Sequence, residues 1–357
     1  MLHRKRLSLA GLLPYELHVA FRAGETAGVS DEQGDAVRNC LRAASVAIAF
    51  SILSGCTDTP APVTAPLDGA EARSSVAPPG TQVQRMRLDL SAATDLRTTI
   101  PVALVTPAAA SNIGPGSAII ITIPDEGRFG CTANFVWRSG GRRYLGAAGH
   151  CFIPADRAAT HGPGADYDAS GVTVEVCVSG CEGNFNTNQI TGTWVTLGSV
   201  RYARQTLDGE DVGNDFGVVE VPREYRDFIR TTMPVWGGPT GVETLALGDF
   251  ACHYGNGLLV GDVFVTKARM GVGGGSDDAS WLGDFAAAFG DSGSGLVGCA
   301  VDGLGSVSGT GAIGVLTHIG VGLDETTGEH GVTFGTTIAR AIAMGAEAGL
   351  NLRLVLQ

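Results

Sequence analysis

The sequence predicts an all-β protein, on two observations. The chain is 44% hydrophobic, and its Val, Ile and Thr residues occur in short segments separated by Gly and Asp, which is typical of short antiparallel strands. With 357 residues, the chain is also long enough for such strands to pack around a sizeable core. The net charge is −12 and no run of Lys or Arg follows the first few residues, so a nucleic-acid partner is not expected.

The first element along the chain is predicted to be an export signal. Arg38 and Arg42 precede the apolar run 43–53, which is too short to span a bilayer as a mature helix but suits a signal. The run ends in Leu53-Ser54-Gly55-Cys56, which resembles the bacterial lipoprotein signal. Residues 1–56 are therefore predicted to be an N-terminal extension and signal, with lipidation at Cys56 on the outer face of a bacterial membrane. An ordinary secretory signal, giving a secreted protein, is the alternative.

Residues 1–36 are charged and mixed, and they place the apolar run deeper than a usual signal does. One hypothesis is that they are not translated and that Val37 is the true initiator. A long cytoplasmic segment before the signal is the alternative.

A tether and a lead-in segment follow, over 57–114. Thr57 to Pro79 is rich in Thr, Pro, Ala and Ser, which is typical of a flexible tether. Residues 80–114 are expected to be a lead-in strand or a short remnant of a propeptide, with strands at Met86–Leu90 and Ile100–Val105.

Three blocks further on contain the residue types needed for acyl transfer. They contain, in chain order, His150, Asp215 and Ser292. Acyl transfer from a peptide needs a hydroxyl nucleophile, an imidazole base and a carboxylate that orients the imidazole. It also needs N–H groups aimed at the developing oxyanion, which the glycines around Ser292 allow Gly290 and Ser292 to provide.

Each block has a simpler interpretation by itself. His150 could be a structural histidine beside a cystine, and Asp215 a solvated carboxylate at a strand edge. Asp208 and Asp211 compete with Asp215 for the third role. Asp215 is preferred because the apolar strand Phe216 to Val219 follows it and would bury it.

The blocks together resemble the trypsin/chymotrypsin-like serine proteases, and most closely their bacterial streptogrisin-like branch. The resemblance includes Cys131 to Trp137, Tyr144 to Cys151, Gly314 to His318 and Gly331 to Gly335. It implies two packed six-stranded antiparallel β-barrels with a C-terminal helix, in one domain over 115–357. The barrels are expected at about 117–221 and 244–335, and the helix at 336–350.

The elements of that domain follow in order. Ser117 to Thr122 is expected to be the first barrel strand, and Arg223 to Gly241 the crossing between barrels. Gly271 to Ser280 is expected to be a Gly/Asp-rich loop that borders the specificity pocket. The Ala-rich segment from Thr336 has Ile338, Ile342 and Met344 on one face, which predicts an amphipathic terminal helix.

Eight cysteines are present, of which Cys40 and Cys56 belong to the signal. An exported domain with six others is expected to be disulfide-bonded, and fifteen pairings are arithmetically open. The resemblance favours Cys131 with Cys151 and Cys252 with Cys299, which leaves Cys177 for Cys181. A metal site at the last two is disfavoured because no other Cys or His pair lies near them in sequence, and no cofactor is expected.

The resemblance also indicates a substrate pocket, formed by Ala286, Ala287, Phe289, Thr317, His318 and Gly331. The expected pocket wall, residues 285–289, has no charged side chain, which favours cleavage after small or medium apolar residues. His318 leaves a glutamate preference open as the alternative, although that site needs hydroxyl donors where Ala287 stands. Asp291 needs a buried partner, and His253 is expected to supply it.

The predicted function is a monomeric serine endopeptidase that acts on protein or peptide substrates. The alternative is a catalytically degenerate surface lipoprotein that serves as a binding module. Gly293-Ser294-Gly295 favours it mildly, because most relatives have Gly-Gly-Pro there.

Overall fold

The computed structural model describes residues 82–105, 113–162, 165–181, 189–207, 211–257, 266–321 and 331–357. The predicted extension, signal, Cys56 and tether lie outside these ranges, as does Asp208. Within the described ranges, no helix is long and apolar enough to cross a membrane.

Six strands of the C-terminal half close into a barrel. Their order is β19-β18-β15-β16-β17-β20, and a further β19–β20 pairing closes the ring. All these pairings are antiparallel, as predicted. The strands are β15 (Leu247–Tyr254), β16 (Ala268–Ser276), β17 (Ser280–Asp284), β18 (Gly295–Val301), β19 (Val307–Val321) and β20 (Gly331–Thr337).

The N-terminal half packs two sheets around one core. One has the order β2-β6-β5-β10-β12-β4, in which β2 is Leu88–Asp89 and β4 is Thr98–Thr99. The other has the order β21-β7-β8-β14-β13-β9, in which β21 is Arg353–Leu354. Together the two halves confirm the predicted all-β, two-barrel class. The central strands are β5 (Ala118–Ile123), β6 (Gly127–Thr132), β7 (Val136–Ser139), β8 (Arg142–Ala147), β9 (Ala159–His161), β10 (Thr173–Ser179), β12 (Thr193–Thr196), β13 (Val200–Gln205) and β14 (Phe216–Val221).

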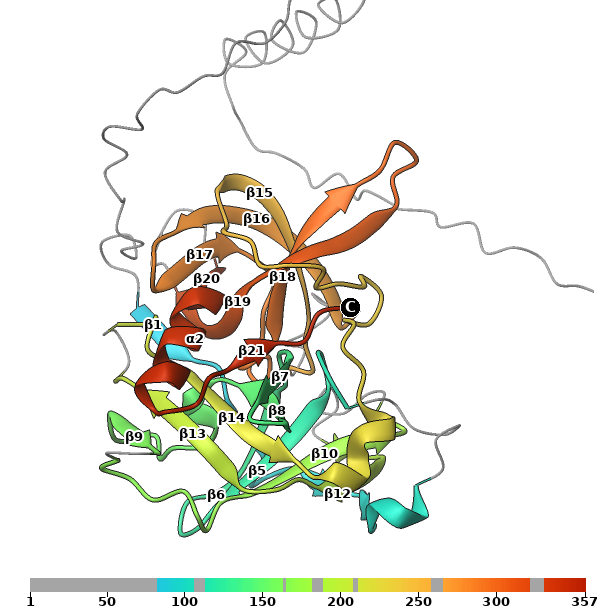
Figure 1. Cartoon of the computed structure of the whole chain (residues 1–357), viewed down its shortest axis with the longest axis vertical. Coiled ribbons are helices and arrows are strands. Elements are labelled where there is room, and N and C mark those ends of the chain that lie inside the picture. The colour runs from blue at the N-terminus through green and yellow to red at the C-terminus, as the bar shows by residue number, and fades with distance from the viewer. Residues whose placement is uncertain are drawn as a thin grey trace, which may run out of the picture. The chain divides into compact units, whose positions relative to one another are not determined.

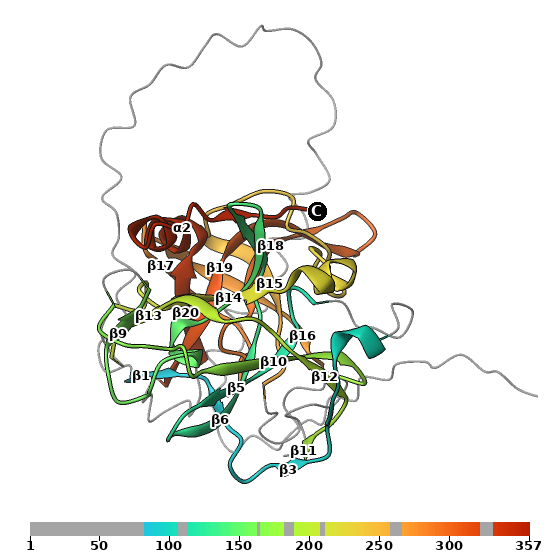
Figure 2. The same cartoon turned by 60° about the horizontal axis from the view of Figure 1, so that its bottom comes forward.

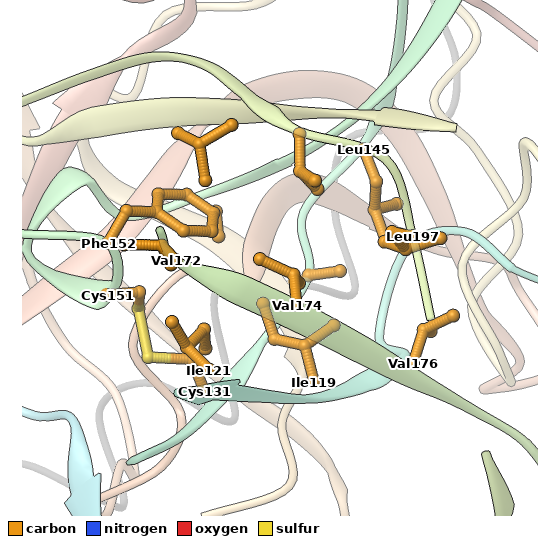
Figure 3. Close-up of a cluster of buried hydrophobic side chains, with 14 of the residues drawn as sticks. Ile119, Ile121, Cys131, Leu145, Cys151, Phe152, Val172, Val174, Val176 and Leu197 are labelled. Atoms are coloured by element: carbon orange, nitrogen blue, oxygen red, sulfur yellow. A yellow bond between two sulfur atoms is a disulfide. The ribbon is translucent and has the colours of Figure 1, made fainter. Parts of the chain in front are cut away.

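Alternate side chains of the strands fill the core of the first barrel. Ile119 and Ile121 of β5 face Val174 and Val176 of β10, and Leu145 of β8 belongs to the same buried cluster (Figure 3). Alternate side chains of a strand point to one side, so each of these strands contributes a row of branched side chains to the core. The strand expected at Ser117 to Thr122 is β5, which begins and ends one residue later than predicted.

The lead-in segment is packed against both barrels. Its first strand, β1 (Gln82–Arg85), pairs with β19 of the second barrel, and β2 (Leu88–Asp89) pairs with β6 of the first. Figure 1 shows β1 between the orange strands of the second barrel and the green strands of the first. The segment therefore passes directly from one barrel to the other.

The rest of the lead-in segment stays on the first barrel. Strand β3 (Thr94–Asp95) lies parallel to β11 (Gln189–Ile190), as Figure 2 shows, and β4 (Thr98–Thr99) lies parallel to β12. The expected strand Ile100–Val105 is wrong, because the chain turns there into a 3-10 helix, η1 (Val102–Leu104). Met86, expected inside a strand, lies between β1 and β2.

The crossing and the terminal helix are close to their predicted positions. The crossing begins with the 3-10 helix η4 (Arg223–Phe228). Helix α2 (Ile338–Glu347) starts two residues later than predicted because β20 continues to Thr337. The hydroxyl of Thr337 caps the helix by accepting from the N–H of Arg340 at 3.1 Å. The helix is followed by β21 (Arg353–Leu354), which pairs with β7.

The glycine-rich segment 271–280 is mostly strand, so the expected pocket loop is wrong. Residues 271–276 continue β16, and only the turn 277–279 separates them from β17. A Cβ on Gly271 would lie 2.1 Å from the carbonyl oxygen of Asp284, and one on Gly274 would lie 2.1 Å from Cδ1 of Leu282. These glycines allow the close approach of neighbouring strands rather than a mobile loop.

The three predicted disulfides are all present. Cys131–Cys151 joins the end of β6 to the 3-10 helix η3 (Gly149–Cys151). Cys252–Cys299 joins β15 to β18, and Cys177–Cys181 closes a short loop after β10.

Candidate active site

The candidate triad lies where the two barrels meet. His150 is in η3, directly after β8, and Asp215 immediately precedes β14. These two strands are hydrogen-bonded neighbours, with Ala147 opposite Gly217, so both residues are held at the same end of the first barrel. Ser292 precedes β18 of the second barrel. Side chains from both barrels and from α2 form the apolar cluster between them, including Phe135, Phe216, Val297, Val315 and Ile338.

His150 bridges the other two members. Its Nδ1 lies 2.6 Å from Oδ2 of Asp215, and its Nε2 lies 2.8 Å from Oγ of Ser292. The backbone N–H of His150 also donates to Oδ1 of Asp215 at 2.9 Å. All three side chains are buried. The imidazole is therefore held in one orientation, with one nitrogen on the carboxylate and the other on the hydroxyl.

Asp215 is held in its ionised form. Burial raises the pKa of this carboxyl, whereas the charge interaction and hydrogen bonds with His150 lower it, and the net shift of the pKa is downward. His318 lowers it further, with its Nδ1 3.9 Å from Oδ2 of Asp215. The hydroxyl of Thr336 donates to the carbonyl of Asp215 at 2.9 Å. An anionic Asp215 can stabilise the imidazolium that forms when His150 takes a proton.

Asp211, the competing carboxylate, serves a turn instead. Its Oδ1 accepts from the N–H of Gly213 at 3.0 Å, and its Oδ2 accepts from the side-chain amide of Asn214. These bonds fix the turn 211–214 that precedes Asp215, and the carboxylate that contacts His150 is that of Asp215.

The predicted oxyanion donor Gly290 is hydrogen-bonded to the lead-in segment. Gly290 has φ of 100°, a conformation that favours glycine, and its N–H donates to the carbonyl oxygen of Met86 at 2.5 Å. The hydroxyl of Thr132 donates to the carbonyl of Gly290 at 2.9 Å. The N–H of Thr132 donates to the carbonyl of Ser292, the other predicted donor, at 2.8 Å. The end of β6 thus holds the loop that contains both predicted donors.

Asp291 is paired with Arg269, which corrects the expectation for His253. The Arg269 guanidinium forms a buried ion pair with Oδ2 of Asp291. The N–H groups of Ala288 and Gly257 each donate to the same carboxylate at 2.7 Å. Arg269 lies directly opposite His253 across the β15–β16 ladder. The cation therefore comes from the neighbouring strand, a placement that adjacency in sequence could not reveal.

His253 has a different set of contacts. Its Nε2 lies 2.8 Å from the carbonyl oxygen of Ala286, and its Nδ1 lies 3.4 Å from Oγ of Ser294. Burial lowers the pKa of this imidazole to about 4; Asp291 opposes that shift and Arg269 adds to it. His253 is therefore neutral at pH 7, and its contact with the Ala286 carbonyl helps to fix that part of the predicted pocket wall.

Met86 fills the space beside Ser292, a contact that sequence analysis missed. Its N–H lies 3.3 Å from the carbonyl oxygen of Thr317 and 3.1 Å from Oγ of Ser292. The side chain is fully buried, in a cluster that contains Phe285 and Ala287. The one sequence signal was a lone apolar residue between Arg85 and Arg87.

The predicted pocket residues are not all placed alike. Ala287 is buried in the cluster of Met86, whereas Phe289 is 40% exposed. Ala286 is half-buried and its carbonyl oxygen lies 2.8 Å from Nε2 of His253. Thr317 is buried and its carbonyl accepts from the N–H of Met86, and His318 is buried with its ring 6.0 Å from that of His150. Gly331 is the first residue of β20 and lies opposite Val321.

One group of metal-ligating residue types comes together among the described residues. It consists of Cys131, His150 and Cys151. Both cysteines are in a disulfide and His150 is bonded on both nitrogens, so these atoms are already used.

Comparisons with known proteins find likeness only in structure. No family model matches the sequence, and no curated protein does. Protease A of Thermobifida fusca is 17% identical, with a TM-score of 0.37, over 68% of this chain and 99% of that one. A Cellulomonas bogoriensis chymotrypsin is 15% identical, with a TM-score of 0.37, over 68% and 98%.

A third similar chain is described as a glutamic acid-specific serine protease with a histidine triad in substrate binding. It is 17% identical, with a TM-score of 0.38, over 67% of this chain and 98% of that one.

Proposed function

We propose that the chain is a serine endopeptidase that cleaves peptide bonds through an acyl-enzyme on Ser292. The observation that supports this most strongly is the position of His150, which contacts Asp215 through one ring nitrogen and Ser292 through the other. A hydroxyl is a weak nucleophile unless a base removes its proton, and this arrangement provides the base and its orienting carboxylate.

The three side chains and the backbone donors have separate roles in this mechanism. Ser292 Oγ attacks the scissile carbonyl while His150 Nε2 takes its proton, and the imidazolium then protonates the leaving amine. Asp215 stays ionised and stabilises the imidazolium. Gly290 N–H, already bonded to a carbonyl oxygen in this structure, stabilises the oxyanion, with Ser292 N–H as the second donor.

The proposed specificity is for small or medium apolar residues before the scissile bond. The buried apolar cluster that contains Ala287 accommodates Met86, which supports an apolar pocket. His318, on which a glutamate preference would depend, lies against Asp215 and bonds the hydroxyl of Thr317 at 2.7 Å. Peptide substrates that differ only at this residue should be cleaved in the order Met or Leu above Glu and Lys; faster cleavage after Glu would reverse the assignment.

Labelling by a fluorophosphonate probe tests the function directly. Ser292 should form the covalent adduct, located by mass spectrometry, and Ser292→Ala should remain unlabelled. Ser294→Ala is the matched control, because this buried serine lies two residues away and contacts His253 rather than His150. Absence of an adduct from a folded chain with an open cleft would favour the alternative, a binding module on a protease fold.

We also propose that the protein is exported and anchored through Cys56. The three disulfides of the described residues support export, since such bonds persist in oxidising compartments. A lipid on Cys56 would hold the protease near the outer face of a membrane, because the 23-residue tether 57–79 has a root-mean-square span of roughly 25–30 Å.

A further inference from the structure

The lead-in segment crosses the candidate active site in the manner of a bound substrate. We infer that the peptide bond between Met86 and Arg87 is the chain's own first substrate, cut by Ser292 of the same molecule. This inference rests on the proposed function and adds to it the bond that is cut and the result of cutting it. Until the cut, the segment closes the cleft to other substrates.

The backbone on the N-terminal side of this bond is held as an added strand. β1 runs antiparallel to β19, with Arg85 opposite His318 and Gln84 opposite Ile319. Met86 continues this pairing through its N–H to Thr317. Its carbonyl oxygen, which belongs to the bond in question, accepts from Gly290 N–H at 2.5 Å. The carbonyl is therefore bound by the donor that would stabilise its oxyanion, and the N–H of the same residue lies 3.1 Å from Oγ of Ser292.

Two arginines hold the segment on either side of Met86. Arg85 donates to the side chain of Gln205 at 2.8 Å and to the carbonyl of Ala155 at 2.7 Å. Arg87 donates to the carbonyls of His150 at 3.1 Å and Ile153 at 2.9 Å. Its guanidinium also lies 3.8 Å above the ring of Phe129, a favourable cation–π contact. Both arginines are positioning residues, which keep the carbonyl of Met86 in place.

The two sides of the cut are attached differently. C-terminal to it, Leu90 is buried in a cluster with Ile120 and Trp194. Strands β2 and β4 pair with β6 and β12 of the first barrel, and β3 pairs with β11. N-terminal to it, the described chain consists of the four residues of β1 and Met86. Cutting should therefore leave residues 87–105 in place and let the N-terminal piece depart. If Cys56 is lipidated, the same cut frees the protease from its anchor.

The reaction balances as an ordinary hydrolysis. Ser292 Oγ bonds to the carbonyl carbon of Met86 as its proton passes to His150 Nε2. The C–N bond to Arg87 then breaks, and the proton from His150 completes the new amino group of Arg87. Water, deprotonated by His150, attacks the ester, which gives the carboxylate of Met86 and restores the hydroxyl of Ser292.

The experiment follows the N-terminus of the full-length chain after purification. Wild type should yield a product that begins at Arg87, at a first-order rate that does not change over a tenfold dilution, because the reaction is intramolecular. Ser292→Ala should stay uncut. Met86→Asp places a charge in an apolar pocket and should slow the cut at least 100-fold. Leu96→Asp, at an exposed position of the same segment, is the matched control and should be cut like wild type.

Fluorophosphonate labelling of Met86→Asp separates the two claims, because the charged side chain is expected to leave the apolar pocket and open the cleft. If wild type stays uncut, or is cut at another bond, while Met86→Asp is labelled on Ser292, the inference is wrong and the proposed function stands. If a folded Met86→Asp is also unlabelled, both fail. Should Met86→Asp not fold, the Arg87 N-terminus in wild type and its absence in Ser292→Ala still decide the inference.

Discussion

Arg269 forms a buried ion pair with Asp291, the residue that precedes the candidate nucleophile. The arginine is 3% exposed and the aspartate fully buried. Two backbone N–H groups complete the coordination of this carboxylate. Since a guanidinium keeps its charge throughout the working pH range, the order of the Gly290 loop should not depend on a titrating partner.

Removing the cation should therefore be costly. Arg269→Met leaves an uncompensated buried charge, which should lower the free energy of unfolding by about 3–5 kcal/mol and slow fluorophosphonate labelling of any folded fraction. Urea denaturation measures the first effect. Arg204→Met is the control, because its pair with Glu347 is partly exposed and should contribute about 1 kcal/mol or less. Equal losses in the two variants would contradict this account.

The choice between the two aspartates can be tested by paired substitutions. Asp215→Asn keeps the shape of the side chain but loses the charge that orients His150, and should lower kcat by about 10⁴-fold. Asp211→Asn alters only a turn and should keep kcat within about tenfold. The assay is peptide hydrolysis in the Met86→Asp background, so that neither variant depends on self-cleavage before it can be measured. Loss of activity in Asp211→Asn with activity kept in Asp215→Asn would transfer the role to Asp211.

His253 should make stability depend on pH. The folded protein keeps this imidazole neutral down to about pH 4, whereas the unfolded chain binds a proton below about 6.5. The unfolded state therefore binds more protons between these values, and stability should fall as pH falls through this window, by about 3 kcal/mol in all. Urea denaturation at pH 7, 5.5 and 4.5 measures the slope.

His253→Phe should flatten that slope, while Ser294→Ala, which removes a neighbour but not the titrating group, should keep it. Activity above pH 8 should be unaffected by the titration of His253, because Arg269 supplies the charge opposite Asp291. An unchanged slope in His253→Phe would show that other groups cause the pH dependence.

The anchor can be tested where the chain stays uncut. In the Met86→Asp background the protease domain should partition into the detergent phase, because several acyl chains on one cysteine give stable anchoring. Cys56→Ser in that background should release the domain or leave the signal uncleaved. Cys40→Ser, just before the apolar run of the signal, should leave partitioning unchanged. A protein wholly soluble in the medium, beginning beyond residue 56 but before 87, would indicate an ordinary secretory signal.

Local patterns in the sequence were sufficient for the all-β class and for singling out His150, Asp215 and Ser292, whereas the two-barrel arrangement came from the family resemblance. Strands such as β5 carry their own alternation, and the glycines around Ser292 mark its turn. Contacts made across strands were not accessible in this way. The pairing of Asp291 with Arg269 depends on the β15–β16 register, and the glycines of β16 were mistaken for a loop because their close neighbours lie on other strands. The placement of Met86 depends on an edge of β19 that no local pattern reveals.

The measurement that tests the central claim most directly is the rate of hydrolysis of a methionyl peptide anilide by Met86→Asp chains with and without Ser292. The account predicts steady hydrolysis by Met86→Asp and by its Ser294→Ala derivative. It predicts a loss of at least about 10⁴-fold in kcat/KM in the Ser292→Ala derivative. Hydrolysis that persists after removal of Ser292, or that is absent from a folded chain that keeps it, would contradict the assignment of this site as a serine endopeptidase.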